Sequence, residues 1–405
     1  MKIFHWKRNV FVLAFANACA AASYTMLVPF LPLYLLELGV EQNQVALYSG
    51  AVFSITFLIA AIMAPIWGKI ADQHGKKPMA IRACIGLSIA YILGGLVTSP
   101  AELFGMRALQ GLANGFLPAA LAITSMSAPK EKLGYSLGIV QTGQIIGGVL
   151  GPLAGGIISS CVGMRASFFL AGSFLFIVTL LVVFAVAEPA LPKTAAPQAE
   201  TQKTDSIWKD LQYAAANRTL LLMLGLSFVI SMSNMILQPV ISLYIAQLQH
   251  SMTNVEFTSG LVFSLGGIAG VLTTAFWGTY GQKHGYFFVM ALAFFGAGFF
   301  NLLQYLPESI LGFAVLQFLF GLFFVGANPA VSAMLVNLTP ANFRARVFGL
   351  YTTASQSGSM VGPLIGSFIS ATLGIRDVFL FTGPFMIFLG IAIWFRWVHT
   401  KAAHC

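Results

Sequence analysis

Charged residues are scarce in this sequence. Only 8% of its 405 residues are charged and 58% are hydrophobic, whereas a soluble domain carries about 25% charged residues. Such a chain has too few charged groups to cover a water-facing surface, which excludes a soluble globular protein. Its 21 bases outnumber its 12 acids and leave a net charge of +9. Because the bases are spread over short loops between apolar runs, they form no clustered basic face for nucleic acid.

Cysteine is also scarce, and the motifs of enzymes are missing. The four cysteines are Cys19, Cys84, Cys161 and Cys405, without CxxC or zinc spacing, so we expect neither a disulfide framework nor a metal site. There is no P-loop, no HExxH and no long loop except 188–217, which leaves no room for a catalytic set. A membrane enzyme and an ATP-driven pump are therefore disfavoured, and we expect no cofactor.

Long apolar segments are abundant, and they come in two groups of six. A membrane crossing takes about 20 apolar residues, and a helix satisfies its own backbone polar groups in hydrocarbon. The ~10-residue alternating segments of a β-barrel are absent. We therefore predict an all-α integral membrane protein with twelve transmembrane helices, at approximately residues 10–36, 48–67, 79–98, 102–126, 135–159, 166–187, 219–246, 257–277, 287–306, 310–335, 345–371 and 378–398.

The N-terminus has two interpretations. Lys2, Lys7 and Arg8, followed by an apolar run and Ala16-Asn17-Ala18, resemble a secretory signal with its cleavage site. The apolar stretch continues to Leu36, which is longer than the hydrophobic region of a signal. We therefore expect an uncleaved first span.

Basic residues indicate the orientation. With the N-terminus inside, eighteen Lys and Arg residues fall in inside loops and only Arg165 and Arg376 in outside loops. Bases concentrate on the cytoplasmic side of membrane proteins. We therefore predict that both termini lie in the cytoplasm.

The two groups of helices are an internal repeat. An offset of 210 residues aligns 49–54 with 259–264, with five identities in six, and Trp67-Gly68 with Trp277-Gly278. After one inserted residue, Gly151-Pro152-Leu153 meets Gly362-Pro363-Leu364. Six spans per repeat keep both halves in the same orientation, which is an arrangement that transporters use to build a site between two halves.

The repeat divides the chain into three parts. We predict one six-helix bundle at 1–187, a cytoplasmic linker rich in Pro, Ala, Thr and Lys at 188–217, and a second bundle at 218–405. Since one chain holds both halves, we expect a monomer.

The loop after the second span carries a specific motif. It reads Gly68-x-x-x-Asp72-x-x-Gly75-Lys76-Lys77, in which the glycines permit a positive φ or a close approach and the lysines suit the headgroup region. It resembles the signature loop of the major facilitator superfamily.

The resemblance implies that Asp72 forms a charge latch with the start of span 11, which here is Arg344-x-Arg346. The second-half copy at 278–285 has Gln282 in place of the Asp and lacks the paired bases.

Span 4 carries Arg107-Ala108-Leu109-Gln110-Gly111. A charged side chain at the centre of a membrane helix costs roughly 2.5–3.5 kcal/mol on insertion scales, so Arg107 requires an explanation. One is that it extends outward and pairs with Glu102. The other follows from the resemblance of Arg-x-x-Gln-Gly to the family's span-4 signature, which implies an Arg that faces the cavity and is linked to proton transfer. The second half has Gln317 at this position.

Span 5 is rich in glycine. Gly147, Gly151 and Gly155 share one face, which permits close approach of a neighbouring helix, and Pro152 removes a helix hydrogen bond. The pattern Gly-x-x-x-Gly-Pro-x-x-Gly-Gly resembles that of the antiporter branches of the superfamily. The likeness, over essentially the whole chain, is to drug:proton antiporters with twelve spans, including bacterial multidrug efflux proteins. It implies proton-coupled export of small amphipathic compounds by alternating access, across the inner membrane of a bacterial cell.

Polar residues inside the spans predict the cavity. In this family spans 1, 4, 7 and 10 surround it, and an amide in hydrocarbon should face protein or water. Each of these side chains could equally bond two helices together. The candidates are Asn17, Tyr24, Arg107, Asn114, Gln141, Gln144, Asn234, Gln238, Gln317, Asn328 and Gln356. Such a cavity suits hydrophobic compounds that are uncharged or anionic.

The proton carrier is harder to identify, because all twelve acids lie at span ends or in loops. Asp72 is the first candidate, and Glu102 with Arg107 the second. The substrate is a small molecule, with membrane lipids as the other partner. Export of one dedicated metabolite or siderophore, and uptake of a nutrient, remain alternatives to drug efflux.

Overall fold

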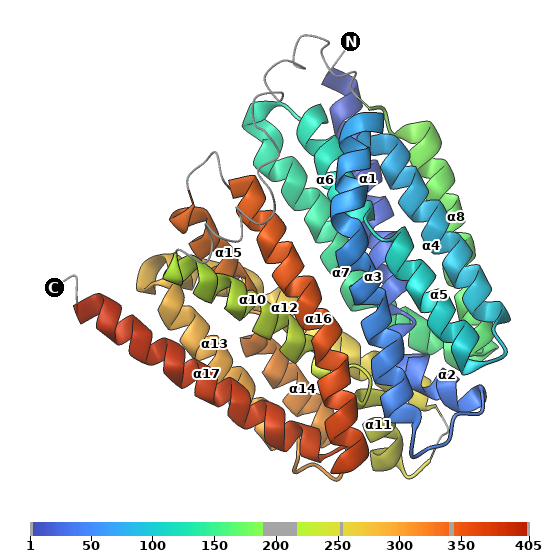
Figure 1. Cartoon of the computed structure of the whole chain (residues 1–405), viewed down its shortest axis with the longest axis vertical. Coiled ribbons are helices and arrows are strands. Elements are labelled where there is room, and N and C mark those ends of the chain that lie inside the picture. The colour runs from blue at the N-terminus through green and yellow to red at the C-terminus, as the bar shows by residue number, and fades with distance from the viewer. Residues whose placement is uncertain (1–2, 189–216, 252–253, 340–343, 403–405) are drawn as a thin grey trace.

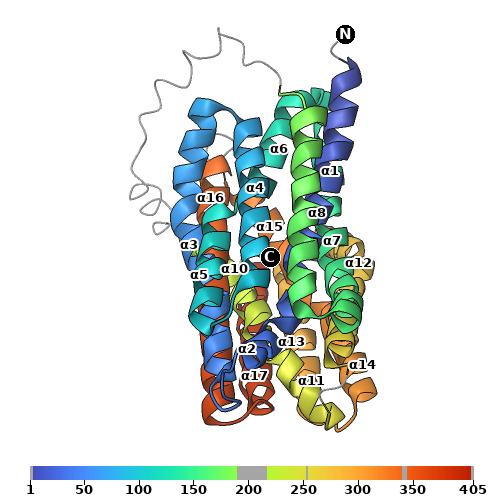
Figure 2. The same cartoon turned by 90° about the vertical axis from the view of Figure 1, so that its right-hand side faces the viewer.

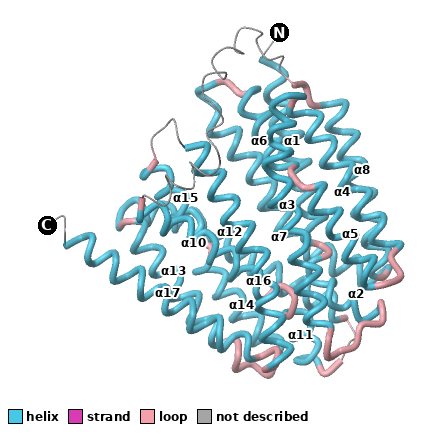
Figure 3. The backbone as a smooth tube through the Cα atoms, in the orientation of Figure 1, coloured by secondary structure: helices cyan, strands magenta, loops and turns pink. Residues whose placement is uncertain are grey.

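In a computed structural model, the described residues are 3–188, 217–251, 254–339 and 344–402, and every regular element among them is a helix (Figures 1 and 3). The first half contains α1 (Ile3–Thr25), η1 (Val28–Phe30), α2 (Leu31–Glu37), α3 (Val45–His74), α4 (Lys76–Leu96), α5 (Pro100–Ala113), α6 (Phe116–Ser127), η2 (Lys130–Lys132), α7 (Leu133–Val162) and α8 (Met164–Ala185). The second half contains α10 (Arg218–Ile236), α11 (Ile241–Gln249), α12 (Val255–His284), α13 (Tyr286–Leu303), α14 (Ile310–Phe324), α15 (Ala327–Leu338), α16 (Arg344–Thr372) and α17 (Asp377–Ala402). The expected linker lies outside the described residues except at its two ends.

Ten stretches of the described residues are long and apolar enough to cross a membrane. The other two expected spans are 102–126 and 345–371. The first is divided between α5 and α6, and the second is α16, a 29-residue helix with Thr, Ser and Gln along it.

Four of the expected spans are not single helices, which corrects the continuous segments read from hydropathy. Span 1 is interrupted by the η1 turn at Val28–Phe30 and span 7 between α10 and α11. Spans 4 and 10 are interrupted between α5 and α6 and between α14 and α15. Apolar composition alone does not detect these breaks, because apolar residues continue through each of them.

Helix pairing repeats between the halves. In the first half α1 packs along α7 and α4 along α8, and in the second α10 packs along α16 and α13 along α17. Hydrogen bonds repeat at the same offset. Tyr34 donates to the Gly94 carbonyl at 3.0 Å, and Tyr244 to the Gln304 carbonyl at 3.2 Å.

Glycines set the distance between α1 and α7. A side chain on Gly147 would overlap the Ala18 carbonyl oxygen, and one on Gly155 the Met26 carbonyl oxygen. In the second half, Gly358 and Gly366 meet carbonyls of α10 in the same way. The helices α7 and α16 are thus held in direct backbone contact with the first helix of their own half.

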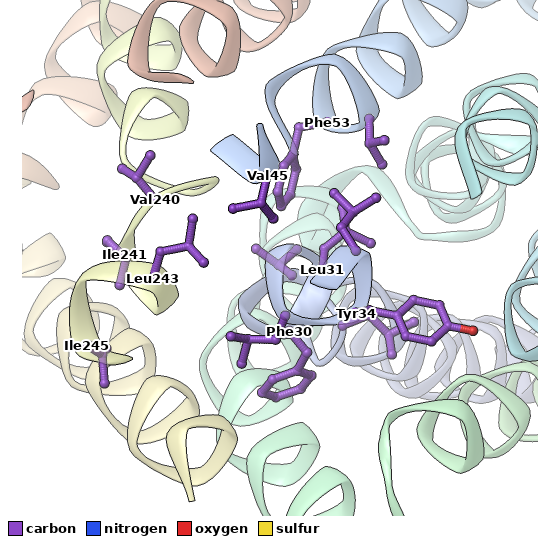
Figure 4. Packing of buried hydrophobic residues seen from close by; sticks show 14 of the residues in the cluster. Phe30, Leu31, Tyr34, Val45, Phe53, Val240, Ile241, Leu243 and Ile245 are labelled. Atoms are coloured by element: carbon purple, nitrogen blue, oxygen red, sulfur yellow. The ribbon is translucent and has the colours of Figure 1, made fainter. Parts of the chain in front are cut away.

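The halves meet at one end and separate toward the other (Figure 1; Figure 2 shows the side view). We name the end that carries the 38–44 turn the outer end and the end that carries Gly75 the inner end, following the charge distribution. Across the halves, α3 packs on α16 and α7 on α12. At the outer end a buried apolar cluster takes residues from both halves, including Phe30, Leu31, Val240 and Ile241 (Figure 4).

Gly147→Ala should lower stability, because the new methyl group has no space against α1. Overpacking of this kind costs about 1–3 kcal/mol. The matched control is Gly148→Ala, at a position with nothing within 4 Å of an added Cβ, where the better helix propensity of Ala favours the helix. The measurement is the thermal unfolding midpoint of the two purified variants in one detergent. Equal midpoints would contradict the role given to the glycine face.

Candidate substrate cavity and its gates

Three neighbouring chambers lie inside the protein. The outermost, of about 370 Å³, is lined mainly by α10, α12 and α14 and by α7. The middle one, of about 400 Å³, lies within the first half and shares Thr25 and Gly148 with the outermost. The innermost, of about 370 Å³, shares Asn114, Leu117 and Gln144 with the middle one and reaches Gly68 and Lys76 at the inner end. Neighbouring chambers thus share part of their walls, in a row that leads from the outer end to the inner end.

Nine of the eleven residues expected in the cavity line these chambers. Asn234, Gln238, Gln317 and Asn328 line the outermost chamber. Asn17 and Tyr24 line the middle one, Gln356 the innermost, and Asn114 and Gln144 both of these. Gln141 is exposed on α7 and lines none of the three, and Arg107 lies behind the wall of the middle chamber. Asn17 also donates to the Val140 carbonyl at 3.0 Å, so it both lines the cavity and bonds α1 to α7.

Arg107 is buried on α5, with 1% of its surface exposed. Its Nη1 donates to Oε1 of Gln110 at 2.8 Å, and Nε2 of Gln110 donates to the Tyr91 hydroxyl at 2.6 Å. Gln110 and Tyr91 line the middle chamber. Arg107 therefore acts on the cavity through these two side chains rather than by facing it directly, which departs from the implication of the family signature.

The pairing of Arg107 with Glu102 is wrong in this structure. Glu102 instead accepts the backbone N–H of Thr98 at 2.7 Å at the start of α5. The physical reason is local: the Ser99 side chain caps the helix, and its first turn offers unpaired N–H groups that attract a carboxylate. Gly111, the last residue of the motif, faces the Thr56 carbonyl of α3, where any side chain would overlap.

Gln317 takes the place of Arg107 in the second half. Its Oε1 accepts from Nε2 of Gln304 at 2.9 Å. The outermost chamber also presents Oε1 of Gln238, which is buried without a hydrogen-bond partner. With Phe263, Phe320 and Phe324 in the same wall, this chamber offers neutral polar groups among aromatic rings.

Span 4 breaks at Asn114–Gly115, beside the chambers. Gly115 has φ +122°, a conformation that favours glycine. The carbonyl of Leu112, exposed by the break, accepts from Nε1 of Trp67 at 2.9 Å and from Nη1 of Arg82 at 3.1 Å, and the Asn114 carbonyl accepts from Nη2 of Arg82 at 2.9 Å. The Arg82 guanidinium lies 3.9 Å from the Trp67 ring centre.

Arg82 is not among the cavity residues expected from the sequence, because it is one of the eighteen bases assigned to inside loops. The structure places it in the second turn of α4, where it lines the innermost chamber. The sequence repeat pairs Trp67 with Trp277. The Nε1 of Trp277 donates to the Leu322 carbonyl at 2.7 Å, as that of Trp67 does to Leu112. The second half has Leu292 at the position of Arg82.

The signature loop lies at the inner end between α3 and α4. Gly75 has φ +99°. Gly68 lies within α3, with no neighbour within 4 Å of an added Cβ, so no close approach explains it here. Lys76 and Lys77 begin α4, and Gly151 and Pro152 lie within α7. The side chains of Asp72, Arg344 and Arg346 are outside the described part of the structure.

Glu188, which had only marked the linker boundary, contacts this loop. Its carboxylate accepts the backbone N–H groups of Lys76 at 2.6 Å and Lys77 at 3.1 Å. A carboxylate at a helix N-terminus is stabilising. The contact joins the end of span 6 to the turn between spans 2 and 3.

At the outer end, two equivalent contacts hold the halves together, and we call this region the outer gate. Ser54 of α3 donates to the Met360 carbonyl of α16 at 2.6 Å, and Ser264 of α12 donates to the Val149 carbonyl of α7 at 2.7 Å. Each carbonyl lies three residues before a proline, next to the carbonyl that the proline leaves without its helix donor. Gly260 lies against the Pro152 carbonyl, and Gly50 lies 2.8 Å, measured from an added Cβ, from the Pro363 carbonyl. The repeat had already paired Ser54 with Ser264 and Gly50 with Gly260.

Comparison with known proteins gives consistent matches. The family model of the Major Facilitator Superfamily matches residues 13–300 and 223–404. The multidrug resistance protein MdtG of Proteus mirabilis is 33% identical over 392 residues, which cover 96% of each chain. A homolog of the multi-drug resistance efflux pump PmrA from Lactococcus lactis is 33% identical, over 95% of this chain and 94% of that protein.

Solved structures share the fold. The nucleoside transporter NupG superimposes with a TM-score of 0.78 at 15% identity, over 96% of this chain and 99% of that one. A bacterial homolog of the human lysosomal transporter Spinster, in an inward-facing and unoccupied conformation, gives a TM-score of 0.75 at 16% identity, over 96% of each chain.

Gly260→Ala should hold the outer gate apart, because the added methyl group would overlap the Pro152 carbonyl across the two halves. Gly278→Ala, on the same helix with nothing within 4 Å, is the control. The distance between spin labels on the exposed Cys161 and on Glu308→Cys, in a Cys405→Ser background, should lengthen only in the first variant. Identical distance distributions would show that this contact does not close the gate.

Proposed function

The chain belongs to the major facilitator superfamily, and we propose that it is a secondary active transporter that exports drugs and similar small amphipathic compounds by alternating access. The observation that carries this proposal is the row of three chambers between the buried cluster at the outer end and the region of Gly68 at the inner end, in which neighbouring chambers share lining residues. The 33% identity to the MdtG and PmrA multidrug proteins supports drugs as the substrate class.

The conformation is inward-facing in this proposal. Substrate enters the innermost chamber, passes Asn114 and Gln144, and reaches the outermost chamber, where amides and phenylalanines take up polar and apolar groups. Release requires the outer gate to open, with loss of the Ser54 and Ser264 hydrogen bonds, while the inner ends of the halves approach each other. The two related halves, 1–187 and 218–405, rock about the cavity, with 188–217 as the cytoplasmic linker and both termini in the cytoplasm.

The proton gradient across a bacterial inner membrane is the energy source that we propose. Asp72 is the proposed protonatable group of the inner gate, with Gly68, Gly75, Lys76 and Lys77 forming the loop around it. Glu188 supports this loop through the N–H groups of the two lysines. Arg107, Gly111 and the glycine face of α7, Gly147, Gly151, Pro152 and Gly155, transmit the movement of the halves. One chain contains all of these parts, so a monomer is sufficient.

Proton coupling is tested in proteoliposomes that contain the purified protein and an internal pH indicator. Addition of a transported drug should move protons opposite to the drug. The susceptibility of a pump-deficient host that expresses the protein selects the drug. A host with unchanged sensitivity to every compound, together with one metabolite that accumulates in a deletion strain, would replace drug efflux by dedicated export.

Asp72→Asn should reduce drug-driven proton movement at least about tenfold, because an amide carries no titratable proton at the gate. Membrane insertion should not change. Gln282→Asn, at the matching position of the second half, is the control and should retain transport. Wild-type rates in Asp72→Asn vesicles would remove Asp72 from the coupling mechanism.

A further inference from the structure

Arg107 is a buried charge without an opposite charge. Apart from Gln110, the described partner of its guanidinium is the Phe53 ring, 5.4 Å away. Both partners are neutral. Its Nε and Nη2 are buried with no hydrogen-bond acceptor.

None of the nine acids among the described residues can compensate this charge from within the membrane, because they lie in loops, at helix ends or, like Glu102, in a terminal turn. The other three acids of the chain are in the segment 189–216, outside the described residues. A cation buried in low dielectric is costly unless an anion accompanies it. The uncompensated positive charge of Arg107 therefore attracts an anionic ligand that is not part of the chain.

The middle chamber gives such an anion a place to bind. Tyr24, Tyr91 and Gln110 line it, and Gln110 bonds both to the Arg107 guanidinium and to the Tyr91 hydroxyl. The Tyr24 hydroxyl is buried without a hydrogen-bond partner. It is a donor in the chamber wall that a ligand can use.

The break in span 4 supplies a second set of donors. The twelve-residue helix α6 begins at Phe116, and Phe116 and Leu117 line the middle chamber. The first N–H groups of a helix have no partner within it, and they carry the positive end of its dipole. The carbonyl end of the break is already satisfied by Trp67 and Arg82. At the amide end Pro118 has no N–H and the N–H of Ala119 bonds to the Gly115 carbonyl, so the N–H groups of Phe116 and Leu117 remain for a ligand. Half-helix N-termini bind anionic substrate groups in other transporters.

The second half lacks each of these features. Gln317 replaces Arg107 and Leu292 replaces Arg82. Val325 and Gly326, between α14 and α15, keep helical backbone angles. The positive features are therefore confined to one side of the cavity.

We propose that the middle chamber is a binding subsite for the anionic group of an amphipathic organic acid, and that such acids are substrates of the export proposed above. The carboxylate accepts from the Tyr24 hydroxyl and from the first N–H groups of α6, with the charge of Arg107 behind the wall. The apolar part of the molecule extends past Thr25 and Gly148, which both chambers share, to Phe263, Phe320 and Phe324. This deepens the proposed function and rests on it for the transport step.

The test compares two probes of nearly the same shape, 1-naphthylacetate and 1-naphthylacetamide. Only the first is ionised at pH 7. The full-length protein in lipid nanodiscs should bind the acid at least about tenfold more tightly than the amide, which corresponds to one charge-assisted hydrogen-bonding site. A wild-type protein that binds the amide equally well or better overturns the proposal.

Variants identify the residues that cause the preference for the acid over the amide. Arg107→Gln and Tyr24→Phe should each reduce the ratio of acid to amide affinity toward one, while Tyr135→Phe, at an exposed tyrosine on α7, should leave it unchanged. Binding of the amide reports that each variant is folded. Arg107→Lys keeps the charge and should retain most of the ratio. An unchanged ratio in both Arg107→Gln and Tyr24→Phe overturns the proposal.

Two further measurements distinguish an organic acid from an inorganic anion and binding from transport. Sodium chloride titrated alone, monitored by tryptophan fluorescence and by displacement of the acid, tests a small inorganic ion. Displacement of the acid at submillimolar chloride overturns the assignment to organic acids. Uptake of the acid into proteoliposomes with the opposite proton movement tests transport. If the protein prefers the acid in a way that depends on Arg107 but does not transport it, the subsite is supported. The same result contradicts the proposed function.

Discussion

A backbone polar group that lies in hydrocarbon must find a partner, and the arrangement of this protein depends on that constraint. It makes the spans helical, and it also decides where they depart from helices. The carbonyls exposed at Asn114–Gly115 accept from Trp67 and Arg82. The carbonyls before the two inner prolines accept from Ser54 and Ser264. The irregular backbone of span 4 thus lies where other helices supply donors, beside the cavity.

The same bonds couple structure to movement. The Ser54 and Ser264 bonds cross between the halves, whereas the contacts of α7 with α1 and of α16 with α10 lie within one half. Backbone contact through glycine makes each half stiff, since no flexible side chain separates the helices. The interface between the halves, by contrast, is held at the outer end by two hydrogen bonds and an apolar cluster. A movement of the halves as units follows from this difference.

Duplication preserved the framework and changed the chemistry. The Tyr34 and Tyr244 bonds, the Trp67 and Trp277 bonds and the two serine bonds are equivalent between the halves. Arg107 and Gln317 are not: the first half has a charge behind its chamber wall, whereas the second half presents neutral amides. A site built between such halves can hold a molecule with two unlike ends. Its polarity comes from a few replaced side chains rather than from a new fold.

The sequence by itself determined the membrane class, the helical spans, the repeat and most of the polar residues of the cavity. These depend on hydropathy, on charge and on backbone bonds made within one segment, all of which are local. It did not locate the break at Gly115, because apolar residues continue through 102–126 and the donors that permit the break come from α3 and α4. It did not reveal that Gln110 rather than Glu102 holds Arg107, or that Glu188 reaches the loop at Gly75. Only the tertiary structure decided these contacts, since each joins residues whose distance in space depends on how the helices pack.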